Sequence, residues 1–134
     1  MALFTKCIFL PIEAGDGTRV STMSRHTLKD GKTLDKRIVL KFGIYDMHLR
    51  MLGPSAKLVG AWHRQEIPWE EFEKKYFERI RNPARMPFVR FVANLAMVTN
   101  VTLLCVEESP RHCHRRLLAE ECKRLKPQLV LIHR

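Results

Sequence analysis

The sequence predicts a single α/β domain with a mainly parallel central sheet and helices on both faces. Val101–Val106 is a run of six residues that is apolar except for Thr102, as expected of a strand buried on both faces. A helical pattern follows it, and Gln128–His133 is a second apolar run. A strand, a crossover helix and a second strand form a parallel unit. A length of 134 residues fits one domain over residues 1–134.

The segment between these two runs is predicted to be a helix that opens on Cys113, His114 and Arg115. Ser109 is a favourable N-cap residue, and Pro110 suits the first helical position. The pair Lys126-Pro127 ends the helix, because a residue before proline avoids helical geometry. The helical period aligns His114 with Leu118 on the stripe that faces the sheet.

This helix start is the predicted functional site. Ligands of open α/β sheets bind beyond the carboxyl ends of the strands, and free N–H groups at a helix start attract anions. The same groups lower the pKa of a nearby thiol, so Cys113 is the candidate nucleophile, with His114 or Arg115 as its partner. Glu107 and His114 are the candidate proton partners. The alternative is that Cys113 and His114 only pack and form hydrogen bonds at a helix start.

The predicted ligand of this site is a small anion, either a phosphate or a carboxylate. Arg25 follows the expected second strand, Thr18–Met23, and can therefore face the same crevice as Cys113. The ligand-binding candidates are Arg25, Ser109 and Arg115. Arg25 also begins a polar loop, Ser24–Arg37, whose length is unusual in a compact domain and often functional. An ordinary exposed loop is the competing interpretation.

The rest of the sequence predicts the remaining strand and helices. Leu3–Leu10 is a first strand, and Ser55 can cap a helix over Ala56–Arg64. Pro68 and Pro87 each open a further helix with aromatic residues at helical spacing. Ile38–Tyr45 suits either a strand or the start of a helix.

Composition limits the classes of protein that remain. No apolar run approaches the ~20 residues of a membrane span, and Met1–Leu10 lacks the features of a secretory signal, so the expected location is the cytoplasm.

The four cysteines form no C-x-x-C pair and are expected to be reduced. Cys113 and Cys122 are expected on opposite faces of one helix, and side chains adjacent to Cys113 diverge. We therefore predict no metal site and no cofactor.

The charge of the chain leaves a second function open. The net charge is +10, which permits binding to nucleic acid. The basic residues are spread along the chain, however, and the densest segment, Arg111–Arg116, is flanked by four glutamates. A non-catalytic, basic, nucleic-acid-binding module is thus the alternative, and a generally solvated basic surface is the simpler explanation.

A further motif is treated as a chance match. Cys105 and Arg111 have the C-x5-R spacing of phosphatase loops. Glu107 and Glu108 lie inside that loop and would repel a phosphate dianion.

The motif residues resemble those of the domain-of-unknown-function family 488 (DUF488). The similar positions are Cys105, Glu107, Pro110 and the triplet Cys113-His114-Arg115. Two upstream segments, Leu52–His63 and Pro68–Ile80, resemble the YeaO-like branch, and together the resemblance covers roughly Arg19–His133. Relatives often carry Asp-Arg or Asp-Val-Arg after the second strand, where this chain has Ser24-Arg25, so only Arg25 carries over. The YeaO-like branch also tends to lack the Cys-His-Arg triplet that this chain keeps. The resemblance implies an α/β fold and no established activity.

Overall fold

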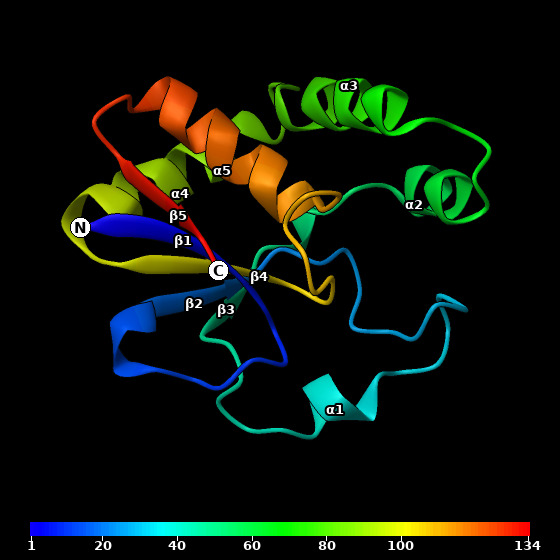
Figure 1. The fold of residues 1–134 in the computed structure, drawn as a ribbon, viewed down its shortest axis with the longest axis horizontal. Helices are drawn as coiled ribbons and strands as arrows, with labels where there is room; N and C mark the ends of the chain where they lie inside the picture. The colour runs from blue at the N-terminus through cyan, green and yellow to red at the C-terminus, as the bar shows by residue number, and fades with distance from the viewer.

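A five-stranded sheet forms the centre of the protein. The computed structural model describes residues 1–134, and its strands lie in the order β3-β2-β4-β1-β5 (Figure 1). Every neighbouring pair is parallel, which confirms the predicted sheet. The strands are β1 (Ala2–Cys7), β2 (Thr18–Ser21), β3 (Met47–His48), β4 (Val101–Cys105) and β5 (Val130–His133).

Five helices connect these strands. They are α1 (Lys36–Val39), α2 (Ala56–His63), α3 (Trp69–Ile80), α4 (Met86–Val98) and α5 (His114–Leu125). Two short 3-10 turns, η1 (Ala14–Asp16) and η2 (Arg50–Leu52), precede β2 and α2. Ser55 caps α2 as predicted, because its hydroxyl accepts a hydrogen bond from the Leu58 N–H at 3.1 Å. None of these helices is long and apolar enough to cross a membrane.

The main core lies between one face of the sheet and helices α2 to α5. Side chains alternate along a strand, so Leu3, Val20 and Leu103 point to this face while their neighbours point to the other. The core helices α3 and α4 both contact α5 or the sheet. This face therefore buries the amphipathic stripes that the sequence pattern indicates.

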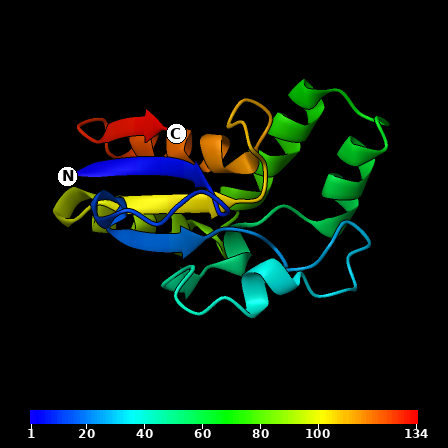
Figure 2. The same cartoon turned by 60° about the horizontal axis from the view of Figure 1, so that its bottom comes forward.

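The opposite face is covered differently. Its apolar cluster is small and includes Ile38 of α1, Leu104 of β4, Cys105 and Cys113. Figure 2 shows α4 and α5 behind the strands and α1 in front of them, beside β2 and β3. Helices thus lie on both faces as predicted, but the second face carries only the one-turn α1 and the short η1.

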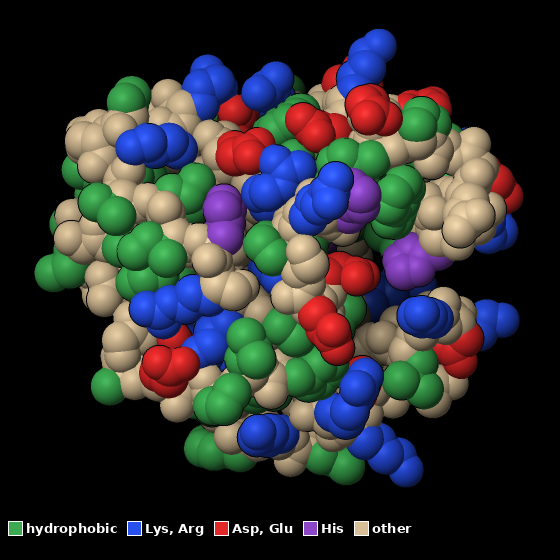
Figure 3. Space-filling view, viewed as in Figure 1, with side chains coloured by type: hydrophobic (Ala, Val, Ile, Leu, Met, Phe, Trp, Pro, Cys, Tyr) green, Lys and Arg blue, Asp and Glu red, His purple; other side chains and the backbone are tan.

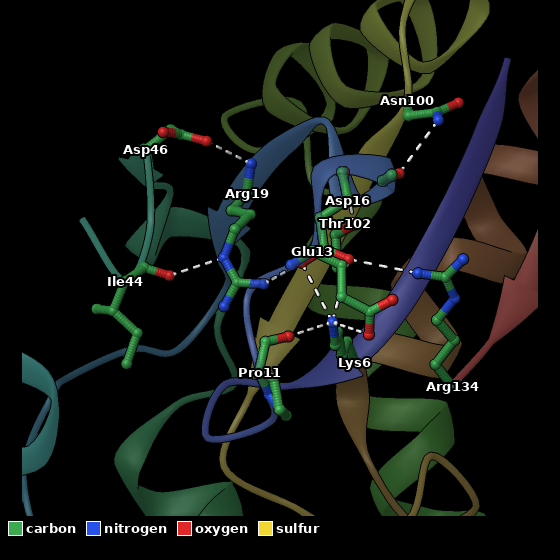
Figure 4. Close-up of polar contacts among 11 residues, drawn as sticks. Lys6, Pro11, Glu13, Asp16, Arg19, Ile44, Asp46, Asn100, Thr102 and Arg134 are labelled. Carbon is green, nitrogen blue, oxygen red and sulfur yellow. Dashed lines mark hydrogen bonds and ion pairs between the residues drawn. The ribbon is translucent and has the colours of Figure 1, made fainter.

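A buried ion cluster completes the second face beside β1 and β2 (Figure 4). Asp16, which is 0% exposed, accepts hydrogen bonds from Lys6, Arg19 and the C-terminal Arg134. Lys6 also binds Glu13, and the Thr102 hydroxyl donates to the Asp16 carbonyl at 2.7 Å. Burial by itself raises the pKa of Asp16, but hydrogen bonds from the Glu13 N–H, Lys6 and Arg19 outweigh it and lower the pKa. We call Lys6, Glu13, Asp16, Arg19 and Arg134 the Asp16 cluster.

Two sequence predictions need correction or completion. The helix after β4 does not begin at Ser109 and Pro110: its N-cap is Cys113, whose backbone is extended, and Ser109 instead accepts a hydrogen bond from the Arg111 N–H at 3.2 Å in a local turn. Arg115 binds the carbonyls of Glu107 and Glu108, and this holds the preceding segment outside the helix. The ambiguous segment Ile38–Tyr45 is mainly turn, with only its first two residues in α1.

Candidate functional site

Three side chains capable of chemistry meet at the carboxyl end of the central strand. Cys105 is the last residue of β4, Cys113 is the N-cap of α5, and His114 is the first residue of that helix. The two sulfurs and one imidazole nitrogen lie within 4.8 Å of one another. All three residues are buried, with exposed fractions of 4%, 2% and 6%. We call Cys105, Cys113 and His114 the thiol cluster.

Hydrogen bonds fix the orientation of the His114 ring. Its Nε2 lies 2.8 Å from the backbone carbonyl of Thr22, which follows β2. A carbonyl only accepts, so Nε2 must carry a proton and donate it. This leaves Nδ1 facing the Cys105 sulfur at 3.8 Å. The imidazole is therefore positioned to exchange a proton with Cys105.

The two cysteines of the cluster have opposite acid–base properties. A hydrogen bond from Cys113 lowers the pKa of Cys105 well below its usual range; burial opposes this shift and His114 adds to it. Burial and the neighbouring Cys105 raise the pKa of Cys113. Burial would lower the pKa of His114, but the adjacent Cys105 sulfur raises it. The favoured charged form is a Cys105 thiolate beside a His114 imidazolium, with Cys113 as a thiol.

Arg115 links this cluster to the loop between β4 and α5. It is 0% exposed, and its guanidinium donates to the carbonyls of Glu107 at 2.5 Å and Glu108 at 3.3 Å. Its Nη1 also donates to the Cys113 sulfur at 3.4 Å. The Nε of Arg115 is buried and has no hydrogen-bond partner. One N–H of this buried cation is thus left without a hydrogen-bond partner.

The structure brings together only some of the residues singled out from the sequence. Cys113, His114 and Arg115 are buried and adjacent. Arg25 is exposed and donates to the Gly31 carbonyl at 3.0 Å, and Ser109 is exposed in its own turn. The Glu107 side chain is half-buried and faces a groove instead of the thiol cluster.

That groove lies beyond the carboxyl ends of β1 and β4. Its volume is about 800 Å³, and its lining includes Cys7, Phe9, Lys29, Arg37, Val106 and Glu107. Cys7 is paired in register with Cys105. Val106 and Phe9 also pack against the apolar cluster that contains Cys105 and Cys113. The groove is therefore lined by neighbours of the thiol cluster and not by the cluster itself.

Sequence reasoning missed Cys105 and Thr22 as members of the site. Cys105 was assigned to the apolar interior of a strand, and its C-x5-R partner, Arg111, is exposed in the structure. The position of Cys105 in the chain could have identified it, because a cysteine at the end of a central strand lies near the start of the next helix. The contribution of Thr22 is a backbone carbonyl, which any residue type supplies.

The thiol cluster is also a group of side chains able to hold a metal ion together. Its donor set of two sulfurs and one imidazole nitrogen would suit a thiophilic ion. Without an ion, the same arrangement provides a nucleophilic sulfur, a proton donor and a second thiol in contact. These are the components of covalent thiol chemistry.

Fold and site together define a small α/β protein with a buried cysteine–histidine centre at the carboxyl edge of its sheet. The chain belongs to the DUF488 family: a family model described as "Active DUF488-N3 subclade" matches residues 3–124. This confirms the resemblance to DUF488 drawn from the sequence, while the YeaO-like branch stays a prediction. Searches of curated proteins and of solved structures found no match.

Proposed function

We propose that this protein is an enzyme that depends on a thiol and uses Cys105 as its nucleophile. The observation that carries the proposal is the contact between Cys105 and Nδ1 of an imidazole whose other nitrogen is committed to the Thr22 carbonyl. Fixing one ring nitrogen fixes the tautomer and points the other at the reacting group. The description of the matching subclade as active is consistent with a catalytic role.

Each neighbour of Cys105 has a distinct role in this proposal. His114 takes the thiol proton and returns it to the leaving group. Cys113, the nucleophile suggested by the sequence, stabilises the thiolate by donating its S–H. Arg115 holds the loop and offers its unpaired Nε to a negatively charged oxygen of the substrate.

The proposed substrate is small and anionic and enters through the groove. Lys29 and Arg37 contribute positive charge there, although Arg37 is paired with Asp35 at 2.7 Å and Glu107 adds negative charge. The burial of Cys105 restricts access to small groups. Four free thiols also fit a reducing compartment such as the cytoplasm, which remains our proposed location.

The nucleic-acid alternative lacks a specific observation in its favour. Figure 3 shows Lys and Arg side chains scattered among Asp and Glu on this face, without a single basic patch. A concentrated basic surface is the electrostatic signature of such binding. Nucleic-acid affinity that survives Cys105→Ser and falls steeply with salt would support this alternative instead.

The test is the relative reactivity of the four cysteines toward a small alkylating reagent. The reduced protein, kept in a chelator, is treated at neutral pH, and each labelled cysteine is quantified by peptide mapping. Cys122 is the internal control, because burial raises its pKa to about 12. We expect Cys105 to be labelled first, at least about tenfold faster than in His114→Gln, since the thiolate fraction changes about tenfold per pKa unit.

Two results would contradict the proposal. One is labelling of Cys105 no faster than labelling of Cys122. The other is labelling of Cys105 at the same rate in wild type and His114→Gln, with both proteins folded by circular dichroism. In either case, His114 does not activate the Cys105 sulfur.

A further inference from the structure

Two thiols of the site lie within 4.8 Å of each other at the two ends of one loop. Cys105 precedes and Cys113 follows the segment Val106–His112, and their sulfurs belong to the set of atoms within 4.8 Å. Val106–His112 contains no helix or strand. A disulfide needs the two sulfurs at about 2.05 Å. The pair is close enough to reach that distance through side-chain rotation and a local shift of the loop.

The other two cysteines, Cys7 and Cys122, form hydrogen bonds outside the thiol cluster. The Cys7 thiol donates to the Val106 carbonyl at 3.5 Å, and the Cys122 thiol donates to the Val89 carbonyl at 3.9 Å. Neither sulfur belongs to the thiol cluster. The pairing is therefore specific to Cys105 and Cys113.

We propose that Cys105 and Cys113 reduce a small hydroperoxide and close a disulfide between them. This rests on the proposed role of Cys105 as the nucleophile. It adds a small neutral oxidant to the proposed anion as a second class of substrate, and it names the second thiol. Burial supports the choice of a small oxidant, because exposed fractions of 4% and 2% exclude a folded partner from both sulfurs.

The reaction has two balanced steps. The Cys105 thiolate attacks one oxygen of the hydroperoxide, the O–O bond breaks, and the leaving oxygen takes a proton from the His114 imidazolium. The products are a Cys105 sulfenic acid and one molecule of water or alcohol. The Cys113 sulfur then attacks the Cys105 sulfur; its proton leaves with the sulfenic hydroxyl as water, and a disulfide remains. An external dithiol returns the pair to the reduced state by exchange.

Arg115 has a defined position in this scheme. Its Nη1 lies 3.4 Å from the Cys113 sulfur, so its positive charge favours the Cys113 thiolate that must form during the second step. Its Nε has no partner and can donate to the departing oxygen. Arg115 would therefore assist both steps without exchanging a proton.

The experiment treats the reduced, chelator-washed protein with stoichiometric hydrogen peroxide. Intact mass and peptide mapping under non-reducing conditions then report the products. The expected product has lost two hydrogens and carries a Cys105–Cys113 disulfide. In Cys113→Ser, the same treatment should leave a Cys105 sulfenic acid that a dione probe traps. Cys122→Ser serves as the matched control and should form the disulfide as fast as wild type does.

The outcomes separate this inference from the proposed function. If Cys105 is alkylated rapidly but peroxide yields only sulfinic acid, or a disulfide to Cys7, the pairing with Cys113 is overturned and Cys105 stays the nucleophile. If Cys105 is not alkylated rapidly, the proposed function fails before the peroxide result is considered. Consumption of peroxide in the presence of a dithiol, lost in Cys105→Ser, would extend the result to turnover.

Discussion

The Asp16 cluster and the thiol cluster are both buried and polar, but they satisfy their charges in different ways. Around Asp16 the charges are permanent: Lys6 and Arg19 are cations whose compensation comes from fixed carboxylates. In the thiol cluster the charges exist only when one proton moves from Cys105 to His114. The first arrangement holds fixed charges, whereas the second forms its ion pair by the transfer of one proton.

The positions of the two clusters in the sheet agree with this difference. Asp16 precedes β2 and therefore lies at the amino end of that strand, whereas Cys105 ends β4. The carboxyl edge of an open parallel sheet is where ligands bind. Gly17, which directly follows Asp16, shows how tightly the amino edge is built: it has φ +64°, and a Cβ there would overlap the Asn100 carbonyl. The amino edge is closely packed at Gly17, and the carboxyl edge ends in loops and a groove.

The largest expected effect is the loss of stability in Asp16→Asn. The substitution leaves Lys6 and Arg19 buried without their carboxylate, and breaking a buried ion pair typically costs about 3–5 kcal/mol. Urea denaturation of the variant measures this loss. Asp30→Asn is the control, because Asp30 is an exposed carboxylate that binds only the local turn at Lys32 and Thr33. Equal losses in the two variants would show that the Asp16 cluster has no special structural role.

A smaller effect is expected from His114→Ala. The Thr22 carbonyl loses its donor, and a buried unsatisfied group costs about 1–3 kcal/mol. The same variant should abolish the rapid alkylation of Cys105, which no substitution in the Asp16 cluster should do while the protein stays folded. A His114→Ala protein that is as stable as wild type would contradict burial of this ring.

Glu121 is a buried carboxylate whose contribution to stability should depend on pH. It is buried, and its pKa falls to about 2: burial opposes the shift, but hydrogen bonds from Arg124 and Arg81 prevail. A depressed pKa gives stability that is present above the ordinary value and lost as the pH falls through the folded value. We expect Glu121→Gln to cost about 1–2 kcal/mol at neutral pH, since both arginines are half-exposed.

The pH dependence checks that assignment. Urea denaturation of wild type and Glu121→Gln should give a stability difference that shrinks as the pH is lowered from about 4.5 toward about 2. A difference that stays constant over this window would mean that Glu121 contributes through packing and not through its charge.

Much of the fold was predictable because its signals are local. The apolar run at Val101 and the helix that follows it gave the parallel unit, and Ser55 marked the start of α2. The helix α5 opens at Cys113 and His114 as predicted, but Ser109 and Pro110, which have cap chemistry, lie in the preceding loop, whose carbonyls Arg115 holds. That contact is tertiary and has no signature in the local pattern.

The site was predictable only in part for the same reason. Cys113, His114 and Arg115 follow from a helix start beyond a strand. Cys105, the partner of His114, lies nine positions earlier in the chain, and the orienting carbonyl belongs to Thr22, which follows β2. The assignment of the thiolate depends on which ring nitrogen is free, and a sequence does not specify a tautomer.

Far-ultraviolet absorbance of thiolate during a pH titration of the reduced protein tests most directly whether His114 ionises Cys105. It requires no access to the buried sulfur, so it reports ionisation alone. At neutral pH we expect thiolate absorbance from one cysteine of the wild-type protein. This absorbance should be lost in both Cys105→Ser and His114→Gln but kept in Cys122→Ser. If thiolate absorbance appears only in the alkaline range of ordinary cysteines, or is retained in Cys105→Ser, then Cys105 is not the ionised thiol.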